Sequence, residues 1–235
     1  MSRALAIKRS PRAARPARPS RPARPRWRRR KQARPSEIIA AAFELFVDRG
    51  YAATKLEDVA RSAGVTKGTM YLYFRSKEAL FRAVVRDALG PVYEAGEQLI
   101  ERHTGTTREL MGDFMRGWWK SLGESRLSGL PKLVISEARN FPEIARLYHE
   151  EAVSRGRELF ARVLRRGIAR GEFRPVDVRY ALRVLGAPIL FAAIWKHSIA
   201  MCETEPFDFG RYIDLHIDLA LNGLTPRAPA GVERA

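Results

Sequence analysis

Residues 54–74 read TKLEDVARSAGVTKGTMYLYF, and this stretch predicts two short helices joined by a tight turn. The first helix has one apolar stripe at three- and four-residue spacing, formed by Leu56, Val59, Ala60 and Ala63. Thr54 and Glu57 have the spacing of a capping box at its start. Gly64 follows the stripe, where a glycine adopts the left-handed C-cap conformation at little cost. The spacing of Ala60 and Gly64 suits helices that cross closely, so we predict a helix-turn-helix.

The second helix of this pair starts after Thr66, a hydroxyl residue at the N-cap position. Met70 and Phe74 follow at four-residue spacing, and we expect both to face the interior. A helix-turn-helix of this kind is typical of DNA-binding proteins. Any small helical hairpin has similar spacing, however, so the spacing alone leaves both interpretations open.

The basic residues of the 235-residue chain are concentrated in its first part. The chain has 43 basic and 26 acidic residues and a formal net charge of +17. Residues 1–34 contain 12 arginines, two lysines and no acidic residue, so the remainder of the chain is nearly neutral. A single cysteine, Cys202, excludes an intrachain disulfide and suits a reducing compartment. This length allows one large domain or two smaller ones.

Residues 10–26, SPRAARPARPSRPARPR, alternate proline with arginine and alanine. Proline and repelling charges prevent a packed core, so we expect residues 1–34 to be a disordered basic arm. Residues 225–235 are expected to form a disordered tail. The arm is suited to lie along DNA phosphates and to add salt-dependent affinity. Three other interpretations stay open: a solvated tail, a translation start assigned too far upstream, and an organelle transit peptide.

Neither a secretory signal nor a membrane span is expected. The Arg-rich start is not followed by the apolar core of a signal peptide. The longest apolar run, Val184–Trp195, has 12 residues including Gly186 and Pro188, whereas a spanning helix needs about 20. We therefore expect no membrane partner and a location in the bacterial cytoplasm, associated with the nucleoid.

A further helix is predicted on each side of the pair. The preceding one runs from Glu37 to about Arg49, with Ser36 as its cap and Gly50 at its end. Its buried stripe is expected to consist of Ile39, Ala42, Phe43 and Phe46. The following helix starts after Ser76, and Gly90-Pro91 should bend or interrupt it before it ends near residue 102.

Residues 38–80, IIAAAFELFVDRGYAATKLEDVARSAGVTKGTMYLYFRSKEAL, resemble the N-terminal domain of the TetR/AcrR transcriptional regulators without a gap. The most specific part of the resemblance is the run AGVTKGTMYLYFRSKEAL. The resemblance implies three helices that bind DNA and a fourth that links them to a ligand-binding, dimerising domain. A shorter run, ISEARNFPEIARLYHE, is similar to the regulatory half of one branch of this family.

The resemblance also implies which residues contact DNA. The recognition helix or its start carries Thr66, Lys67, Gly68, Thr69, Tyr71 and Tyr73, and a backbone-contacting Lys77 begins the linking helix. Amides of the first turns after Thr54 and Thr66 suit phosphates. Lys67 and Thr69 are long enough to reach base edges, and a tyrosine hydroxyl suits phosphate contact. Lys55 replaces a hydroxyl residue that family members often carry, and we expect it to contact the DNA backbone.

From residue 106 onward the chain shows helical stripes separated by short breaks and no strand-like alternation. A wide aromatic and methionine stripe predicts that Met111, Met115, Trp118, Trp119, Phe141 and Tyr148 line a cavity for an apolar or amphipathic effector. The alternative is that these residues are ordinary core.

The last two predicted helices, residues 180–201 and 208–224, are the expected dimer surface. The middle of the first, LGAPILFAAIW, is apolar nearly all round and so needs cover on both sides. A two-fold bundle is expected to bury Leu185, Ile189, Ala192, Ala193, Tyr212, Leu215 and Leu219 between two copies. The alternative is a helix wholly internal to a monomer.

Together these observations predict an all-α protein of about nine helices. Residues 35–80 form the DNA-binding domain and residues 81–224 the effector-binding and dimerisation domain. The expected function is that of a homodimeric repressor that leaves a palindromic operator when a small hydrophobic effector binds. A sequence-tolerant, nucleoid-type protein driven by the arm is the alternative. No phosphate-loop, nucleophile-elbow, paired-histidine or clustered-cysteine pattern is present, so we expect no catalytic residue, metal or cofactor.

Overall fold

The computed structural model describes residues 34–226, and all regular secondary structure in this part of the chain is helical. The all-α prediction is therefore confirmed. Residues 1–33 of the predicted arm (1–34) and residues 227–235 of the predicted tail (225–235) lie outside the described residues, whereas Arg34, predicted in the arm, begins the first helix. The elements are α1 (Arg34–Ala53), α2 (Leu56–Ser62), α3 (Lys67–Tyr73), α4 (Lys77–Arg102), α5 (Thr107–Trp118), the π-helix η1 (Trp119–Gly123), the 3-10 helix η2 (Arg126–Ser128), α6 (Gly129–Glu137), α7 (Pro142–Tyr148), the π-helix η3 (His149–Val153), α8 (Ser154–Ala169), α9 (Val178–Lys196), the 3-10 helix η4 (Ala200–Cys202) and α10 (Phe209–Leu224).

Helix α1 packs against α2, α4 and α6, and its apolar stripe differs slightly from the prediction. Ile38, Ala42 and Phe46 are fully buried, whereas Ile39 and Phe43 are half-buried. Because α1 contacts neighbours on several sides, its buried face extends one residue further round than a single stripe predicts. Gly50 breaks the helix with a φ of 87°, as predicted, and a last turn follows to Ala53.

The turn between α2 and α3 has the predicted geometry. Gly64 adopts a φ of 63°, in the left-handed region. The amide of Val65 donates to the carbonyl of Ala60 at 2.9 Å, which closes the end of α2. At the start of α3, the hydroxyl of Thr66 accepts from the amide of Thr69 at 3.1 Å. Met70 is fully buried below this turn, so both caps hold α3 against the core.

Helix α4 is continuous through Gly90 and Pro91, so the predicted interruption does not occur. A proline removes one helical hydrogen bond, and the lost stability has to be offset by packing. Leu89, Val92 and Tyr93 on either side of the pair are buried against neighbouring helices. This continuity makes α4 a single element that follows α3 in the chain and packs against both α5 and α8.

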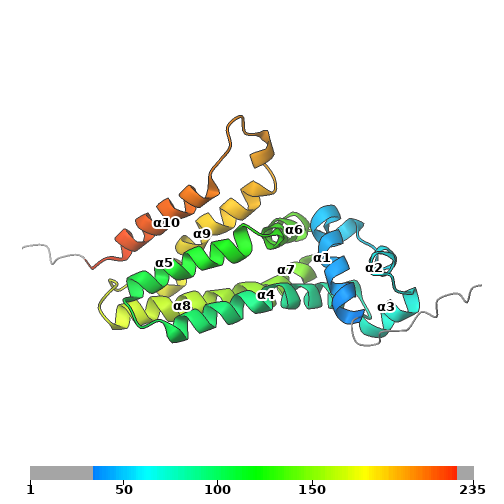
Figure 1. Cartoon of the computed structure of the whole chain (residues 1–235), viewed down its shortest axis with the longest axis horizontal. Helices are drawn as coiled ribbons and strands as arrows, with labels where there is room; N and C mark the ends of the chain where they lie inside the picture. Colours follow the sequence, from blue (N-terminus) through cyan, green and yellow to red (C-terminus); the bar gives the residue numbers. More distant parts are fainter. Residues whose placement is uncertain (1–33, 227–235) are drawn as a thin grey trace, which may run out of the picture. The chain divides into compact units, whose positions relative to one another are not determined.

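The second half of the chain is a set of helices packed around α5 and α8 (Figure 1). Helix α5 contacts α4, α8 and α10, while α9 contacts α6, α8 and α10. Figure 1 shows α9 and α10 side by side, joined by the connection that contains η4. Among the described helices, α9 is long and apolar enough to cross a membrane by length and composition alone.

Candidate nucleic-acid interface and cavity

The surface of α3 is open to solvent and carries polar and aromatic side chains. Lys67 and Gly68 are exposed, and Tyr71 and Tyr73 are 40% and 36% exposed. A methyl group at Gly68 would meet nothing nearer than the Thr66 hydroxyl at 3.9 Å, so backbone can approach a ligand closely here. Of the residues predicted for the recognition helix, all are therefore exposed except Thr69, which is half-buried.

Lys67 is held by an acidic residue of α2. Its Nζ lies 2.7 Å from Oε1 of Glu57 and 5.8 Å from the centre of the Tyr71 ring. The hydrogen bond from Lys67 lowers the pKa of Glu57, and the same bond raises the pKa of Lys67. A base contact by Lys67 therefore competes with its pairing to Glu57, and sequence spacing does not reveal this pairing.

Thr54 is the clearest correction among the predicted DNA contacts. Its side chain is only 2% exposed, and its hydroxyl lies 2.8 Å from the carbonyl oxygen of Gly50 and 3.1 Å from that of Leu45. The break at Gly50 leaves carbonyls that need donors, and Thr54 supplies one. The N-cap of α2 is Lys55, without a side-chain cap bond, so the predicted capping box is wrong.

The two other predicted lysine contacts have different environments. Lys55 is exposed at the start of α2. Nζ of Lys77 donates to the carbonyl of Ala52 at 3.2 Å and lies 4.3 Å from the centre of the Tyr51 ring. Burial lowers the pKa of Lys77. Lys77 thus ties the start of α4 to the end of α1, while the side chain of Lys55 is open to solvent.

Leu72 was not predicted as a surface residue of functional interest. It lies on α3 between Tyr71 and Tyr73 and is 77% exposed. The stripe of Met70 and Phe74 places Leu72 on the opposite, outer side of the helix, so the spacing contained this information. An exposed leucine on a recognition helix suits apolar contact with a thymine methyl group.

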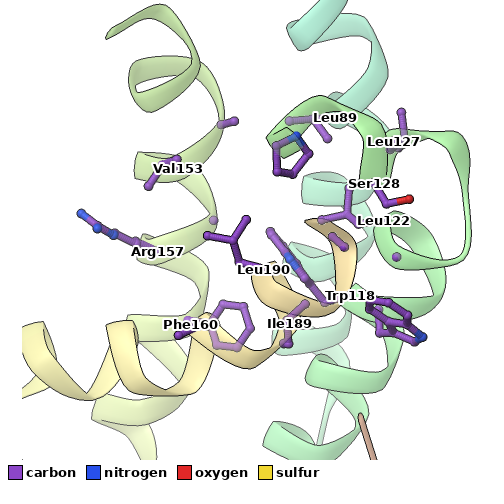
Figure 2. Close-up of a pocket in the computed structure, with 18 of the residues that line it drawn as sticks. Leu89, Trp118, Leu122, Leu127, Ser128, Val153, Arg157, Phe160, Ile189 and Leu190 are labelled. Atoms are coloured by element: carbon purple, nitrogen blue, oxygen red, sulfur yellow. The ribbon is translucent and has the colours of Figure 1, made fainter. Parts of the chain in front are cut away.

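A cavity of about 420 Å³ lies between α4, α5, α8 and α9, within the range of about 300–1,000 Å³ typical of small-molecule sites. Figure 2 shows its apolar wall, which includes Leu89, Trp118, Leu122, Phe160, Ile189 and Leu190. Both π-helices contribute to this wall, η1 through Trp119 and Leu122 and η3 through Ala152 and Val153. Such π-turns are frequent at functional sites.

Three of the six residues predicted to line a cavity do so: Trp118, Trp119 and Tyr148. Met111 and Met115 do not, because they are fully buried in the interior core. Phe141 does not either, since its ring packs edge-on against Tyr51 with centroids 5.1 Å apart. The sequence stripe of α5 identified an apolar surface but not which part of it borders the cavity.

Few polar side chains interrupt the cavity wall, and they lie on opposite sides of it. On one side, the hydroxyl of Ser128 lies 2.6 Å from Nε2 of His197 and donates to the carbonyl of Ser125 at 2.7 Å. Burial lowers the pKa of His197, and the nearby Lys196 contributes. On the other side, Arg157 of α8 points away from the apolar wall (Figure 2). Arg183 of α9 also lines the cavity.

The predicted dimer residues divide into two groups. Leu185, Ile189, Ala192 and Ala193 are buried within this chain, so they cannot form an intersubunit surface. Leu215 and Leu219 of α10 are 59% and 63% exposed, and Tyr212 is half-buried beside Phe207. The apolar stripe of α9 that stays uncovered is formed by Tyr180, Val184, Ala187 and Phe191. Because α9 packs on α6, α8 and α10, the α9 residues predicted to face a second subunit face the interior of this chain instead.

A capped recognition helix, together with a helical half that encloses a cavity, defines a DNA-binding transcriptional regulator that responds to a ligand. The chain belongs to the TetR family. Residues 38–84 match the family model for bacterial regulatory proteins of the tetR family. Residues 101–201 match the model for the tetracyclin repressor-like C-terminal domain. The two models together cover more than half of the chain.

Curated relatives agree with this assignment, and a solved structure has the same fold. The HTH-type transcriptional repressor KstR2 of Mycolicibacterium smegmatis is 30% identical over 162 residues, 63% of this chain and 73% of that protein. The fatty acid metabolism regulator protein of Bacillus subtilis is 28% identical over 158 residues, 66% of this chain and 80% of that protein. The fold also matches FadR from Bacillus subtilis in complex with stearoyl-CoA, with a TM-score of 0.66, 24% identity, and 80% and 98% of the two chains covered.

Proposed function

We propose that this regulator is a homodimeric repressor of a palindromic operator, and that a long-chain acyl compound releases it. The observation that carries the proposal is the apolar cavity of about 420 Å³ between α4, α5, α8 and α9. A relative acts in fatty acid metabolism, and a protein of the same fold was solved with stearoyl-CoA. An acyl chain suits an apolar wall, because its burial releases ordered water.

On DNA, α3 enters the major groove with its outer face. Lys67 and Thr69 read base edges, Leu72 meets a thymine methyl group, and Tyr71 bonds a phosphate. Lys55 and the first turn of α3 contact the backbone on either side. The face is exposed, which supports this assignment.

A two-fold dimer is supported by the uncovered apolar faces of α9 and α10. Leaving Val184, Phe191, Leu215 and Leu219 in water costs about 25 cal/mol for each square ångström of apolar surface. Pairing these faces around a two-fold axis makes an intersubunit bundle and sets the separation of the two recognition helices.

The η2–α6 segment connects the cavity with the DNA-binding unit. Leu127 and Ser128 line the cavity, while Nη2 of Arg126 lies 2.9 Å from Glu44 and 2.5 Å from Asp48 on α1. At the other end of α6, Glu137 accepts from the amide of Ala52 at 3.0 Å. An effector that binds one arrangement about 100-fold more tightly supplies about 2.7 kcal/mol of coupling through such contacts.

The DNA half of the proposal is tested with DNA fragments that the purified protein retains from its own genome. Lys67→Ala combined with Tyr71→Ala should abolish discrimination between a retained fragment and random DNA in fluorescence anisotropy. The matched control is Lys120→Ala, which changes an exposed lysine of η1 far along the chain from α3. Unchanged discrimination in the double variant would show that α3 is not the reader.

The effector half is tested by releasing the protein from the same fragment with acyl-CoAs and fatty acids of increasing chain length. Release should improve with chain length until the cavity is full. Leu190→Trp, which places a large side chain in the cavity, should raise the concentration needed by at least about tenfold. Ile135→Trp is the control, because Ile135 is 56% exposed and does not line the cavity.

The nucleoid-type alternative predicts binding that depends on charge rather than on α3. Membership of a regulatory family and the neutral body of the protein both favour specific reading by α3 over bulk charge. Action in the cytoplasm on nucleoid DNA follows from this proposal. An enzymatic role has no support in a family of DNA-binding regulators.

A further inference from the structure

A second cleft adjoins the effector cavity and has a different character. It has a volume of about 620 Å³ and lies between α8 and the start of α9. The two spaces share Arg157, Leu182 and Arg183 in their walls. A ligand that fills the apolar cavity would therefore pass these two arginines to reach the cleft.

The arginines of the cleft are not equivalent. Arg165 pairs with Glu158 at 3.0 Å, and Arg179 donates to the Tyr180 hydroxyl at 2.9 Å with its guanidinium 4.7 Å from that ring. Within residues 34–226, neither Arg157 nor Arg183 pairs with a carboxylate. Arg183 donates one bond to the carbonyl of Arg179 at 2.8 Å and keeps its other donors. Two guanidinium groups at the junction are thus available for an anion.

The acidic residues of the cleft are already engaged. Glu158 faces Arg165, and Oδ1 of Asp177 accepts from the amides of Arg179 and Tyr180 at 2.8 and 3.3 Å. The wall of the cleft carries four arginines but only these two carboxylates, so positive charge remains in excess there. A polar cleft that keeps unpaired positive charge beside an apolar cavity is complementary to an amphiphile with an anionic head.

We propose that Arg157 and Arg183 bind the phosphate-bearing headgroup of the effector while its apolar part occupies the cavity. One guanidinium group can donate two parallel hydrogen bonds to the oxygens of a phosphate, and this planar geometry adds specificity as well as energy. A cleft of this volume holds more than a single carboxylate, so a nucleotide-like head fits better than the head of a free fatty acid. The inference rests on the proposed function, because it requires an effector in the cavity.

The test measures binding of palmitoyl-CoA, palmitate and 3′,5′-ADP by isothermal titration calorimetry to the full chain and to Arg157→Gln/Arg183→Gln. We expect palmitoyl-CoA to bind the double variant about 100-fold more weakly or worse, since the charge-assisted contacts of both arginines with the phosphates are lost. Palmitate should lose less than about threefold. Arg162→Gln is the matched control, because Arg162 is exposed on α8 and lies outside both walls.

The outcomes separate this site from the proposed function. Equal losses for palmitoyl-CoA and palmitate, or no loss for either, would overturn the headgroup site. If the wild-type protein binds palmitate but gains nothing from the CoA head, the cavity proposal stands and the headgroup site is wrong. Weak binding of 3′,5′-ADP that the double variant loses supports the site even if palmitate fails to bind. Absence of binding for all three probes overturns both proposals.

A rescue variant excludes a merely structural effect. Arg157→Lys/Arg183→Lys keeps both charges but loses the paired donors, so it should recover only part of the palmitoyl-CoA affinity. Full recovery would mean that charge alone attracts the head. The thermal midpoints of all variants should stay within about 2 °C of wild type, because substitutions of exposed side chains change stability little.

Discussion

The DNA-binding unit and the effector half are both helical, but they use apolar side chains in opposite ways. In the DNA-binding unit, Phe46, Tyr51 and Phe81 pack ring against ring with centroids 5.5–5.6 Å apart. In the effector half, aromatic residues such as Trp118 and Phe160 border a hollow. One region must hold α3 at a defined position, whereas the other must leave space and tolerate rearrangement. Stability and function should therefore separate between the two regions.

The largest difference between the two regions is expected when one leucine in each of them is truncated to alanine. Leu80→Ala should cost about 2–5 kcal/mol, because Leu80 is fully buried in the packed unit and its loss leaves an enclosed void. Leu190→Ala should cost less than about 1 kcal/mol, because Leu190 is 43% exposed and borders an existing cavity. Urea unfolding at one fixed protein concentration measures both. Equal costs would contradict the distinction.

A matched pair of glycines tests whether the turn depends on backbone conformation or on space. A methyl group at Gly64 or at Gly117 would meet nothing within 4 Å beyond the adjacent residues of the chain. Gly64 has a φ of 63°, so Gly64→Ala should cost about 1–2 kcal/mol and weaken operator binding. Gly117→Ala lies inside helix α5 and should instead stabilise the protein by about 0.5–1 kcal/mol. Thermal unfolding should give opposite signs, and the same sign for both would refute the conformational argument.

Ion pairs of Glu151 join η3, which lines the cavity, to α4, the helix that follows α3 in the chain. Substituting Glu151 tests how much this connection stabilises the fold. Glu151 lies 2.5 Å from Arg82 and 2.7 Å from Arg86. Glu151→Gln should lower stability by about 1 kcal/mol at neutral pH, since both arginines are partly exposed to solvent.

The pH dependence of this effect has a defined sign. Hydrogen bonds, first that from Arg86, lower the pKa of Glu151 below its ordinary value. The carboxylate therefore stabilises the fold above the ordinary glutamate pKa, and this contribution disappears as the pH falls through the lowered value. The difference between wild type and Glu151→Gln should shrink on acidification, and a difference that grows would contradict the assignment.

The smallest expected effect concerns the pair that holds Lys67. Glu57→Gln releases Lys67 and removes a negative charge beside the DNA, so operator affinity should rise about fivefold. Asp58→Asn removes an equal charge on the same turn. Because Asp58 pairs with Arg61 at 3.1 Å, its substitution should raise the operator affinity less. Anisotropy titrations at one salt concentration compare them. A weaker complex with Glu57→Gln would mean that Glu57 positions Lys67 for DNA.

Local signals were predictable where each depends on a few neighbouring residues. Thr66 and Ser76 cap their helices, and Gly64 takes the left-handed conformation. Predictions failed where the partner of a side chain comes from another element. The hydroxyl of Thr54 bonds carbonyl groups near the break in α1 and not DNA-facing groups. Met111 and Met115 pack in the core and do not line the cavity.

The sequence by itself determined the helices, their caps, the turn before α3 and the family, because these depend on spacing over a few residues or on a continuous motif. Only the tertiary structure decided that α9 turns Leu185 and Ile189 inward and leaves Val184 and Phe191 uncovered. It also decided that the cavity meets a basic cleft at Arg157 and Arg183. The physical reason is that an apolar helix has several faces of similar hydrophobicity. Packing against distant helices selects which face is buried and where space remains.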